Sequence, residues 1–296
     1  MVAKLSRPET SGLLFALVAP TIYGAGIPLS KVFLDYAGPW LLTGLLQFGA
    51  GLGMSVLYFA RPRRTDIALQ GKDWPRFAIS LVMGGVFASV LMMVGLRGTT
   101  AATASLLLNL EGVSTATIAW MLFRERFSRR LAIGLFVITA GGALLCLGGD
   151  GAQVRISWAA LALVGACLSW GIAANVAQHI SGRDPVQMVA LRGLIAGGGN
   201  ILLALLVGER CAHWQVIPLA AMAGLITDGV AVLCYIIAQS RIGTSRTATF
   251  FALAPLVGAS VALLVLKETP TTTLLVAGGF MLFGLGICLG EKHVSA

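Results

Sequence analysis

Long apolar runs dominate the chain, and short polar connections separate them. Each run holds about 20 mostly apolar residues, which is the length a helix needs to cross the hydrocarbon core of a bilayer. The pattern predicts an all-α membrane protein with ten transmembrane helices and almost nothing left for a soluble domain. The predicted spans are 12–34, 38–60, 75–96, 99–123, 131–148, 156–181, 185–207, 214–240, 244–267 and 270–290.

Composition supports a membrane location. Apolar residues make up 57% of the 296 residues and charged residues only 11%, against roughly a half and a quarter in soluble domains. So few charges cannot cover the surface of a soluble globule of this size, and so apolar a chain does not remain disordered. The excess apolar surface is therefore expected to face lipid. The 37 glycines fit close helix packing in a bilayer.

The basic residues are distributed unevenly between the two sides of the predicted membrane. With the N-terminus inside, 15 Lys and Arg fall in cytoplasmic segments and 4 in outer segments. This asymmetry predicts that both termini are cytoplasmic. Because the net charge of +9 sits in short clusters between apolar runs, it does not indicate nucleic-acid binding. With no organelle-targeting segment, the cytoplasmic (inner) membrane of a prokaryote is the expected location.

A weak internal repeat runs through the chain. Tyr23-Gly24 matches Trp170-Gly171 at an offset of 147. Five further matches share an offset of 143: Leu110, Ala116, Ala119, Glu125 and Gly141 correspond to Leu253, Ala259, Ala262, Glu268 and Gly284. The collinear matches divide the chain into five-helix halves, 1–150 and 151–296, within one integral membrane unit. Because five is odd, the second half must enter the membrane from the opposite side, giving an inverted-topology repeat. Such repeats are typical of secondary transporters with a midplane site and alternating access.

Two related helix endings carry a resemblance to a known family. The first is Leu108-Asn109-Leu110-Glu111 followed by Arg124-Glu125, and the second is Ala254-Pro255-Leu256 followed by Lys267-Glu268. Over nearly the whole chain the sequence resembles the drug/metabolite transporter superfamily, in particular its EamA-type members. It departs from the family pattern at Gly112, where the second half has Pro255. The resemblance implies export or exchange of small organic solutes, with helices 1, 3, 4, 6, 8 and 9 around a central cavity. It leaves monomer and homodimer open.

Of the ionisable residues in the predicted spans, three lie well away from the span ends, where charge is costly and usually functional. They are Glu111, Asp228 and Arg192. In the functional interpretation Glu111 couples transport to protons or recognises an amine, and Asp228 is a second cavity charge. The structural alternative is a buried ion pair, for example Arg192 with one of the carboxylates, or Arg192 extending towards the cytoplasmic face.

Several polar and aromatic side chains are further candidates for the substrate site. On a continuous fourth helix, Glu111 shares a face with Thr103, Leu107, Ser114 and Thr115, while Asn109 points the other way. The sequence does not decide which face lines the cavity. Tyr235 follows Asp228 by seven residues, Asn175 lies on the sixth span, and Tyr23 and Trp170 are repeat-related aromatics that could stack on a cation. Gln47 also belongs to the candidate set, although its face with Gly44 and Gly51 favours helix packing.

Three prolines interrupt predicted spans and remove backbone donors. Pro20 and Pro28 lie in the first span and Pro255 in the ninth. Each is a candidate hinge, with a static kink as the alternative. Glu125 and Glu268, beside basic neighbours, are interpreted as anchors at helix ends.

Motifs of enzymes and metal sites are absent from the sequence. There is no HExxH, GxSxG or Walker A motif, and the three histidines and five cysteines have no metal-ligand spacing. We therefore expect no catalytic residues, metal or cofactor. The predicted function is secondary transport of small organic metabolites, with amino acids or related amines preferred. The expected partners are the solute, lipid and protons as the coupling ion. The alternative is an uncoupled, channel-like facilitator for small solutes.

Overall fold

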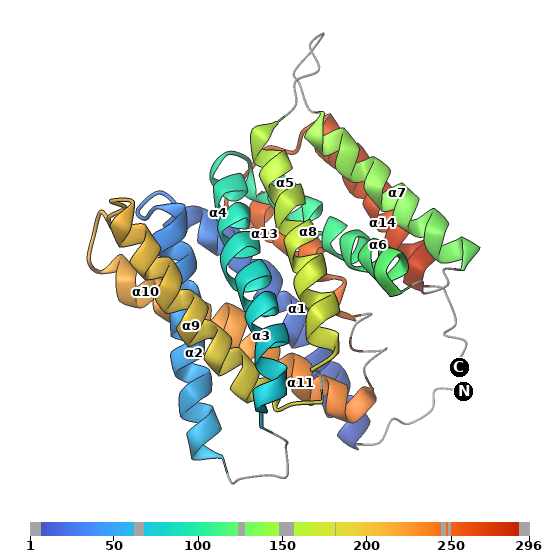
Figure 1. Cartoon of the computed structure of the whole chain (residues 1–296). Coiled ribbons are helices and arrows are strands. Elements are labelled where there is room, and N and C mark those ends of the chain that lie inside the picture. The colour runs from blue at the N-terminus through green and yellow to red at the C-terminus, as the bar shows by residue number, and fades with distance from the viewer. Residues whose placement is uncertain are drawn as a thin grey trace. The chain divides into compact units, whose positions relative to one another are not determined.

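The fold was analysed in a computed structural model that describes residues 7–61, 68–123, 128–147, 157–180, 182–243, 247 and 250–289. Over these residues the chain is helical, without strands, apart from one isolated antiparallel bridge between Ala37 and Cys211. Figure 1 shows the helices. Their bounds are α1 Arg7–Phe33, α2 Pro39–Ala60, α3 Trp74–Ser80, α4 Ser89–Arg97, α5 Ala101–Leu107, α6 Leu110–Phe123, α7 Arg129–Cys146, α8 Trp158–Gln178, α9 Pro185–Leu206, α10 Val216–Gly224, α11 Ala231–Ile242, α13 Ala254–Val265 and α14 Thr272–Leu289.

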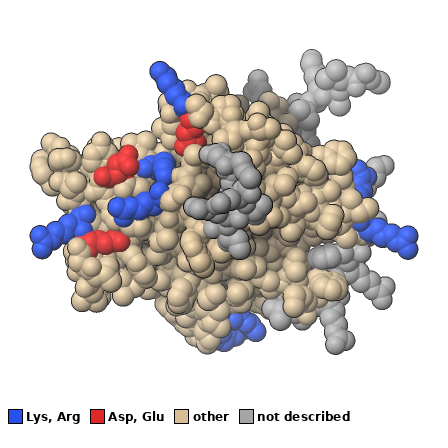
Figure 2. Space-filling view, turned by 90° about the horizontal axis from the view of Figure 1, so that it is seen from above, with Lys and Arg blue, Asp and Glu red and all other residues tan. Residues whose placement is uncertain are grey.

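Within the described part of the chain, seven of the predicted spans appear as helices long and apolar enough to cross a membrane. They are Thr10–Phe33, Pro39–Ala60, Gly71–Arg97, Arg129–Cys146, Trp158–Gln178, Pro185–Leu206 and Val216–Ile242. The ninth and tenth predictions correspond to shorter apolar helices, Ala254–Val265 and Thr272–Cys288. Figure 2, seen from above, shows a face that is mostly tan, with Lys, Arg, Asp and Glu side chains at a few places on it.

The prediction of one continuous helix over 99–123 is wrong. The helix stops after Leu107 and a new one, α6, begins at Leu110. At the break, two backbone hydrogen bonds reach back three residues instead of the four of an α-helix. The Asn109 N–H donates to the Leu106 carbonyl and the Glu111 N–H donates to the Leu108 carbonyl, each at 3.0 Å. The Asn109 side chain also donates to the Leu106 carbonyl at 3.0 Å. A short amide side chain that competes for backbone groups favours such an interruption.

A second break and two wide turns occur at related positions along the chain. Residues 252–253 interrupt the helix before α13, 144 residues after the break at 108–109. Two π-helical segments also lie 144 residues apart, η2 over Leu81–Ala88 between α3 and α4 and η3 over Leu225–Val230 between α10 and α11. The hydrophobic pattern alone does not reveal these irregularities, because the runs stay apolar through each of them.

The helices form two compact units that do not coincide with the predicted sequence halves. The first unit comprises Met1–Trp74 and Ser181–Gly258, and the second Pro75–Ile180 and Ala259–Ala296. Each unit therefore combines segments from both predicted halves.

In the first unit, α2 and α9 pack through a seam of glycines. A Cβ added at Gly44 would lie 2.7 Å from the Ile201 nitrogen, and one at Gly193 would lie 2.5 Å from the Gly51 Cα. The backbones are therefore too close for any side chain. Within this seam Asn200, fully buried, donates to the Gln47 side chain at 3.1 Å. The contact gives Gln47 a role in helix packing, as its glycine-rich face suggests.

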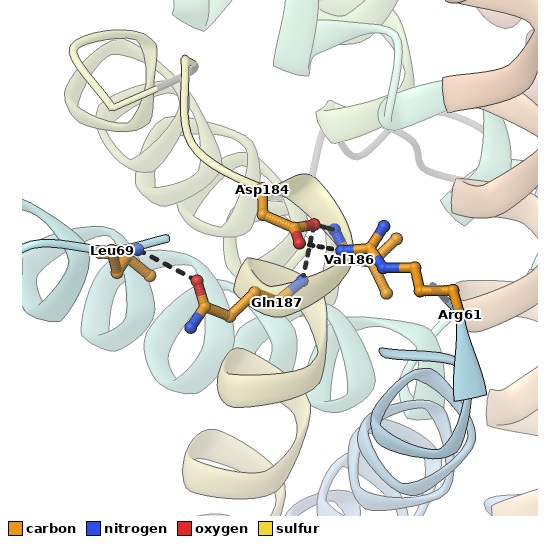
Figure 3. A network of polar contacts seen from close by, with 5 residues as sticks. All are labelled: Arg61, Leu69, Asp184, Val186 and Gln187. Atoms are coloured by element: carbon orange, nitrogen blue, oxygen red, sulfur yellow. Dashed lines mark hydrogen bonds and ion pairs between the residues drawn. The ribbon is translucent and has the colours of Figure 1, made fainter. Parts of the chain in front are cut away.

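A polar network closes one end of this seam (Figure 3). Asp184, the N-cap of α9, accepts hydrogen bonds from the backbone N–H groups of Val186 at 2.9 Å and Gln187 at 3.2 Å. Its other oxygen pairs with the Arg61 guanidinium at the end of α2. The Gln187 side chain accepts from the Leu69 N–H at 3.0 Å. One carboxylate thus caps α9 and holds the end of α2.

A second ion pair lies close by in the chain. Arg183 Nε lies 2.7 Å from Asp73 Oδ2, and the same carboxylate oxygen accepts from the Gln70 N–H at 2.9 Å. At the other end of α2, the Glu209 carboxylate accepts from the Leu41 N–H at 2.9 Å. Both ends of the α2–α9 pair are therefore fixed by carboxylates on helix N-termini, where the helix dipole favours negative charge.

In the second unit, α7 and α14 lie side by side (Figure 1), with Gly134 and Gly284 in close backbone contact. Glu268 caps α5, since its carboxylate accepts from the N–H groups of Ala101 at 2.7 Å and Ala102 at 2.9 Å. This agrees with its interpretation as a helix-end anchor. Its repeat counterpart Glu125 lies outside the described residues.

Candidate substrate-binding site

The candidate residues fall into two groups, one in each compact unit. The first unit holds Tyr23, Gln47, Arg192, Asp228 and Tyr235. The second holds Asn109, Glu111, Trp170 and Asn175. The two predicted carboxylates therefore belong to different units, and each has its own surroundings.

Glu111 lies in the first turn of α6, directly after the helix break. A carboxylate is favoured there by the unpaired N–H groups of the helix start. The Glu111 carboxylate interacts electrostatically with Cys167 of α8. The Cys167 thiol donates a hydrogen bond to the Leu107 carbonyl at 3.6 Å. Because α5 and α6 are separate helices, the predicted common face of Glu111 with Thr103 and Leu107 is wrong. Only Ser114 and Thr115 share its helix.

Trp170 has a specific role at the wide turn η2. Its indole N–H donates to the Gly84 carbonyl at 3.1 Å, and the Ser89 hydroxyl donates to the same carbonyl at 2.9 Å. A π-helical turn changes the pairing of backbone carbonyls, and these two side chains satisfy one of them. Trp170 therefore supports the backbone of the third span.

Asn175 is buried between α8 and α6. Its amide nitrogen donates to the Thr115 carbonyl at 3.0 Å and to the Gly171 carbonyl of its own helix at 2.8 Å. Both of its donors are thus engaged with the backbone. The Asn109 side-chain amide likewise donates to the Leu106 carbonyl and to the Met281 sulfur, the latter at 3.9 Å. These contacts fix helices in place and leave Glu111 as the charged candidate of the second unit.

In the first unit Asp228 lies within the wide turn η3, and the charge of Arg192 on α9 acts on it. Both side chains are half-buried. The neighbouring Thr227 packs on α1, because a Cβ added at Gly26 would lie 2.9 Å from the Thr227 Cβ. Arg192 and Asp228 thus place two opposite charges within the spans of the first unit, and their predicted ion pair stays a prediction.

Three aromatic rings gather in the same unit. Tyr23 of α1 lies 5.2 Å from Phe251 between ring centroids with planes at 45°, and Tyr235 of α11 lies 5.1 Å from Phe251 with planes at 75°. All three side chains are half-buried. The sequence indicated the two tyrosines but missed Phe251. A phenylalanine in an apolar run carries no signal in the sequence that sets it apart.

The three prolines differ in their surroundings. Helix α1 continues through both Pro20 and Pro28, and both side chains are fully buried. Pro255 lies in the first turn of α13, where a missing N–H has no intrahelical partner to lose. Their predicted role as hinges stays a prediction.

Among the described residues no group of three or more His, Cys, Asp or Glu side chains could hold a metal ion. The candidate side chains in the two units are carboxylates, an arginine, amides and aromatic rings. These groups suit recognition of an organic solute through charge, hydrogen bonds and ring faces.

Comparison with known proteins decides the class of the chain. The model of the EamA-like transporter family matches it twice, over residues 10–147 and 157–290. The chain belongs to the EamA-like transporter family. An uncharacterized transporter of Methanothermobacter thermautotrophicus is 23% identical over 93% of this chain and 85% of its own length. A crystal structure with 19% identity shares the fold, with a TM-score of 0.68 over 97% of this chain and 99% of the other.

Membership of the EamA-like family makes the chain a multi-pass membrane protein and a transporter rather than an enzyme. The resemblance seen in the two helix endings is thereby confirmed. A membrane transporter of this class acts on a small molecule while in contact with lipid.

Proposed function

We propose that this EamA-like protein is a secondary transporter that exports or exchanges small organic metabolites by alternating access. The transported solutes are amino acids or related amines. In this proposal the chain consists of two inverted five-helix repeats, and access to the substrate alternates between the two sides of the membrane.

One observation carries the proposal: the paired irregularities of the backbone. Wide turns at η2 and η3, and helix breaks at 108–109 and 252–253, recur 144 residues apart. Interrupted helices in corresponding positions of two repeats are the usual sign of a transporter binding site. An ionisable residue accompanies one irregularity of each kind, Asp228 within η3 and Glu111 directly after the first break.

The nature of these groups favours amino-bearing solutes. Asp228 and Glu111 can accept hydrogen bonds from an ammonium group, and ring faces such as that of Tyr23 attract cations. Arg192 can bind a carboxylate in a two-pronged geometry.

Counterflow in proteoliposomes tests the proposal. Vesicles are loaded with a panel of unlabelled amino acids, amines and nucleosides, and uptake of labelled solute is followed at pH 6 and pH 8. Saturable exchange of at least one amino-bearing solute is expected. Linear, unsaturable uptake would instead indicate a channel-like facilitator, and no flux with any solute would contradict transport of this class.

The Glu111→Gln variant tests proton coupling in the same assay. We expect transport by the native protein to depend on pH and transport by the variant to lose that dependence. Glu209→Gln is the matched control, because Glu209 caps α2 through the Leu41 N–H and an amide oxygen can accept the same bond. Equal pH dependence in Glu111→Gln and the native protein would remove Glu111 as the coupling residue.

A further inference from the structure

The chain passes between the two compact units at three places, and two of these lie at the ends of helices. The three crossings are Trp74–Pro75, Ile180–Ser181 and Gly258–Ala259. The first lies where α3 begins, the second shortly after α8 ends, and the third inside α13. Hinges are usually a few residues at the ends of elements, whose backbone angles change during a movement. The first two crossings are therefore the places to look for a hinge.

The segments beside these two crossings are bound to each other within the first unit. Arg183 Nε lies 2.7 Å from Asp73 Oδ2, and Arg183 Nη2 donates to Gln70 Oε1 at 3.3 Å. The Gln187 side chain accepts from the Leu69 N–H at 3.0 Å (Figure 3). The hydrogen-bonded residues are 113 and 118 positions apart in the sequence, so these contacts join two distant parts of the chain. We call these five residues the clamp.

The ion pair of the clamp lies where both segments leave the first unit. Asp73 comes directly before the first crossing, and Arg183 follows Ile180 by three residues. The Asp73 side chain is 4% exposed and the Arg183 side chain 14%. Opening a buried ion pair leaves a buried charge without its partner, which is strongly unfavourable. The clamp is therefore built to stay closed.

The chain has backbone freedom next to the clamp. Gly182 lies between the second crossing and Arg183, in a turn where an added Cβ would meet nothing within 4 Å. Packing therefore does not require a glycine there, whereas a change of backbone angles is easiest at a glycine. Movement can thus occur beside a clamp that itself stays closed.

We propose that the clamp is the hinge of the transport movement: it holds the two connections together throughout the cycle, and the units turn relative to each other about it. The inference rests on the proposed function and gives its alternating access a fixed point in the chain. Two other roles are possible for such a contact. A gate would open in every cycle, and a purely stabilising contact would not affect the movement.

A reversible cross-link separates these three roles. In a variant whose five cysteines are replaced by serine, Asp73→Cys and Arg183→Cys remove the ion pair. The maximal exchange rate in the counterflow assay should fall roughly tenfold against the serine background. Bridging the two cysteines with propane-1,3-diyl bis-methanethiosulfonate should raise the rate again, and a reductant that cleaves the bridge should lower it. Asp73→Cys alone, treated with the same reagent, is the control and should stay slow.

Each other outcome overturns the hinge. A rate that falls on bridging and recovers with reductant would show that the clamp opens in every cycle. A rate that bridging leaves unchanged, with the bridge seen in the intact mass, would leave only a stabilising contact. Failure of the cysteines to bridge would mean that the two connections do not lie side by side.

Substitutions of the arginine test the charge in the native background. Arg183→Gln should lower the maximal exchange rate roughly tenfold, while Arg183→Lys, which keeps the charge, should retain most of it. Solute bound per mole of protein should not change in either variant, because only a folding defect lowers binding and rate together. Arg130→Gln is the matched control, since Arg130 Nε donates to the Ile287 carbonyl at 3.1 Å within the second unit. Equal slowing in Arg130→Gln would contradict a special role of Arg183.

The outcomes separate this inference from the proposed function. Exchange by the native protein that continues at the same rate in Arg183→Gln overturns the hinge and leaves the transporter in place. No exchange of any solute by the native protein overturns both.

Discussion

Single residues in this protein fix the ends of helices and the contacts between them. Asp184 caps α9 through two backbone N–H groups and also pairs with Arg61, so one carboxylate fixes a helix start and a neighbouring helix end. Gly193 shapes the helix seam, and Asn109 ends a helix with its own side chain. Replacing such a residue lowers the free energy of unfolding by an amount that depends on which of its contacts is lost.

For Asp184 the two functions can be separated by substitution. Asp184→Asn keeps a good N-cap and loses the charge that pairs with Arg61, so it should cost about 1–3 kcal/mol, because the Asp184 carboxylate is buried. Asp184→Ala also loses the cap and should cost about 1 kcal/mol more. Thermal unfolding of the purified variants in detergent measures the order native, Asn, Ala. An equal loss in both variants would mean that the ion pair, not the cap, dominates.

At the scale of helices, the sequence predicted the long spans well because apolar length alone defines them. Helices α2, α8 and α9 begin and end within a few residues of their predicted limits. The break at Asn109 and the wide turn around Asp228 could not be predicted in this way, because the hydropathy of a segment does not depend on which backbone groups form hydrogen bonds with each other. The repeat offset of 143 is close to their spacing of 144 residues, but one sequence shows only that two segments are related, not that both are irregular.

The glycine seam between α2 and α9 gives a prediction for helix packing. A Cβ at Gly193 would lie 2.5 Å from the Gly51 Cα, whereas a Cβ at Gly198 meets nothing within 4 Å. Gly193→Ala should therefore destabilise the protein by about 1–3 kcal/mol through overpacking. Gly198→Ala, five residues away on the same helix, should be neutral or slightly stabilising. Denaturant unfolding of both variants checks the difference, and equal stability would place the close helix contact in doubt.

The wide turn η2 gives a prediction about shared hydrogen bonds. Trp170 and Ser89 both donate to the Gly84 carbonyl, so either alone can satisfy it. Trp170→Phe and Ser89→Ala should each destabilise modestly. The double variant should lose more than the sum, because a buried carbonyl left without a donor costs about 1–3 kcal/mol. Trp120→Phe, at a side chain that is 53% exposed, controls for the loss of indole volume. Additive losses would show that the two donors act independently.

At the scale of the whole molecule, contacts within each unit agree with the sidedness inferred from basic residues. Arg61 meets Asp184 from connections both predicted to be cytoplasmic. Glu209 meets the start of α2 from connections both predicted to be outside, and Glu268 does the same for α5 in the second unit. Each contact joins segments assigned to the same side. The candidate site was harder to predict than this topology. Arg192 and Asp228 stand out as charges in apolar runs, but Phe251 has no such signal.

These contacts relate segments to one another, so labelling is needed to decide which side faces the cytoplasm. In a variant with its five cysteines replaced by serine, single cysteines are introduced at Gln215 and Gly71, both exposed. The basic residues predict Gln215 outside and Gly71 inside. A membrane-impermeant maleimide added to intact cells should label Gln215→Cys at once and Gly71→Cys only after the membrane is opened. The reverse result would invert the topology and exchange the two faces of the transporter. Labelling of both in intact cells would place both connections outside, which an odd number of membrane crossings between residues 71 and 215 does not allow.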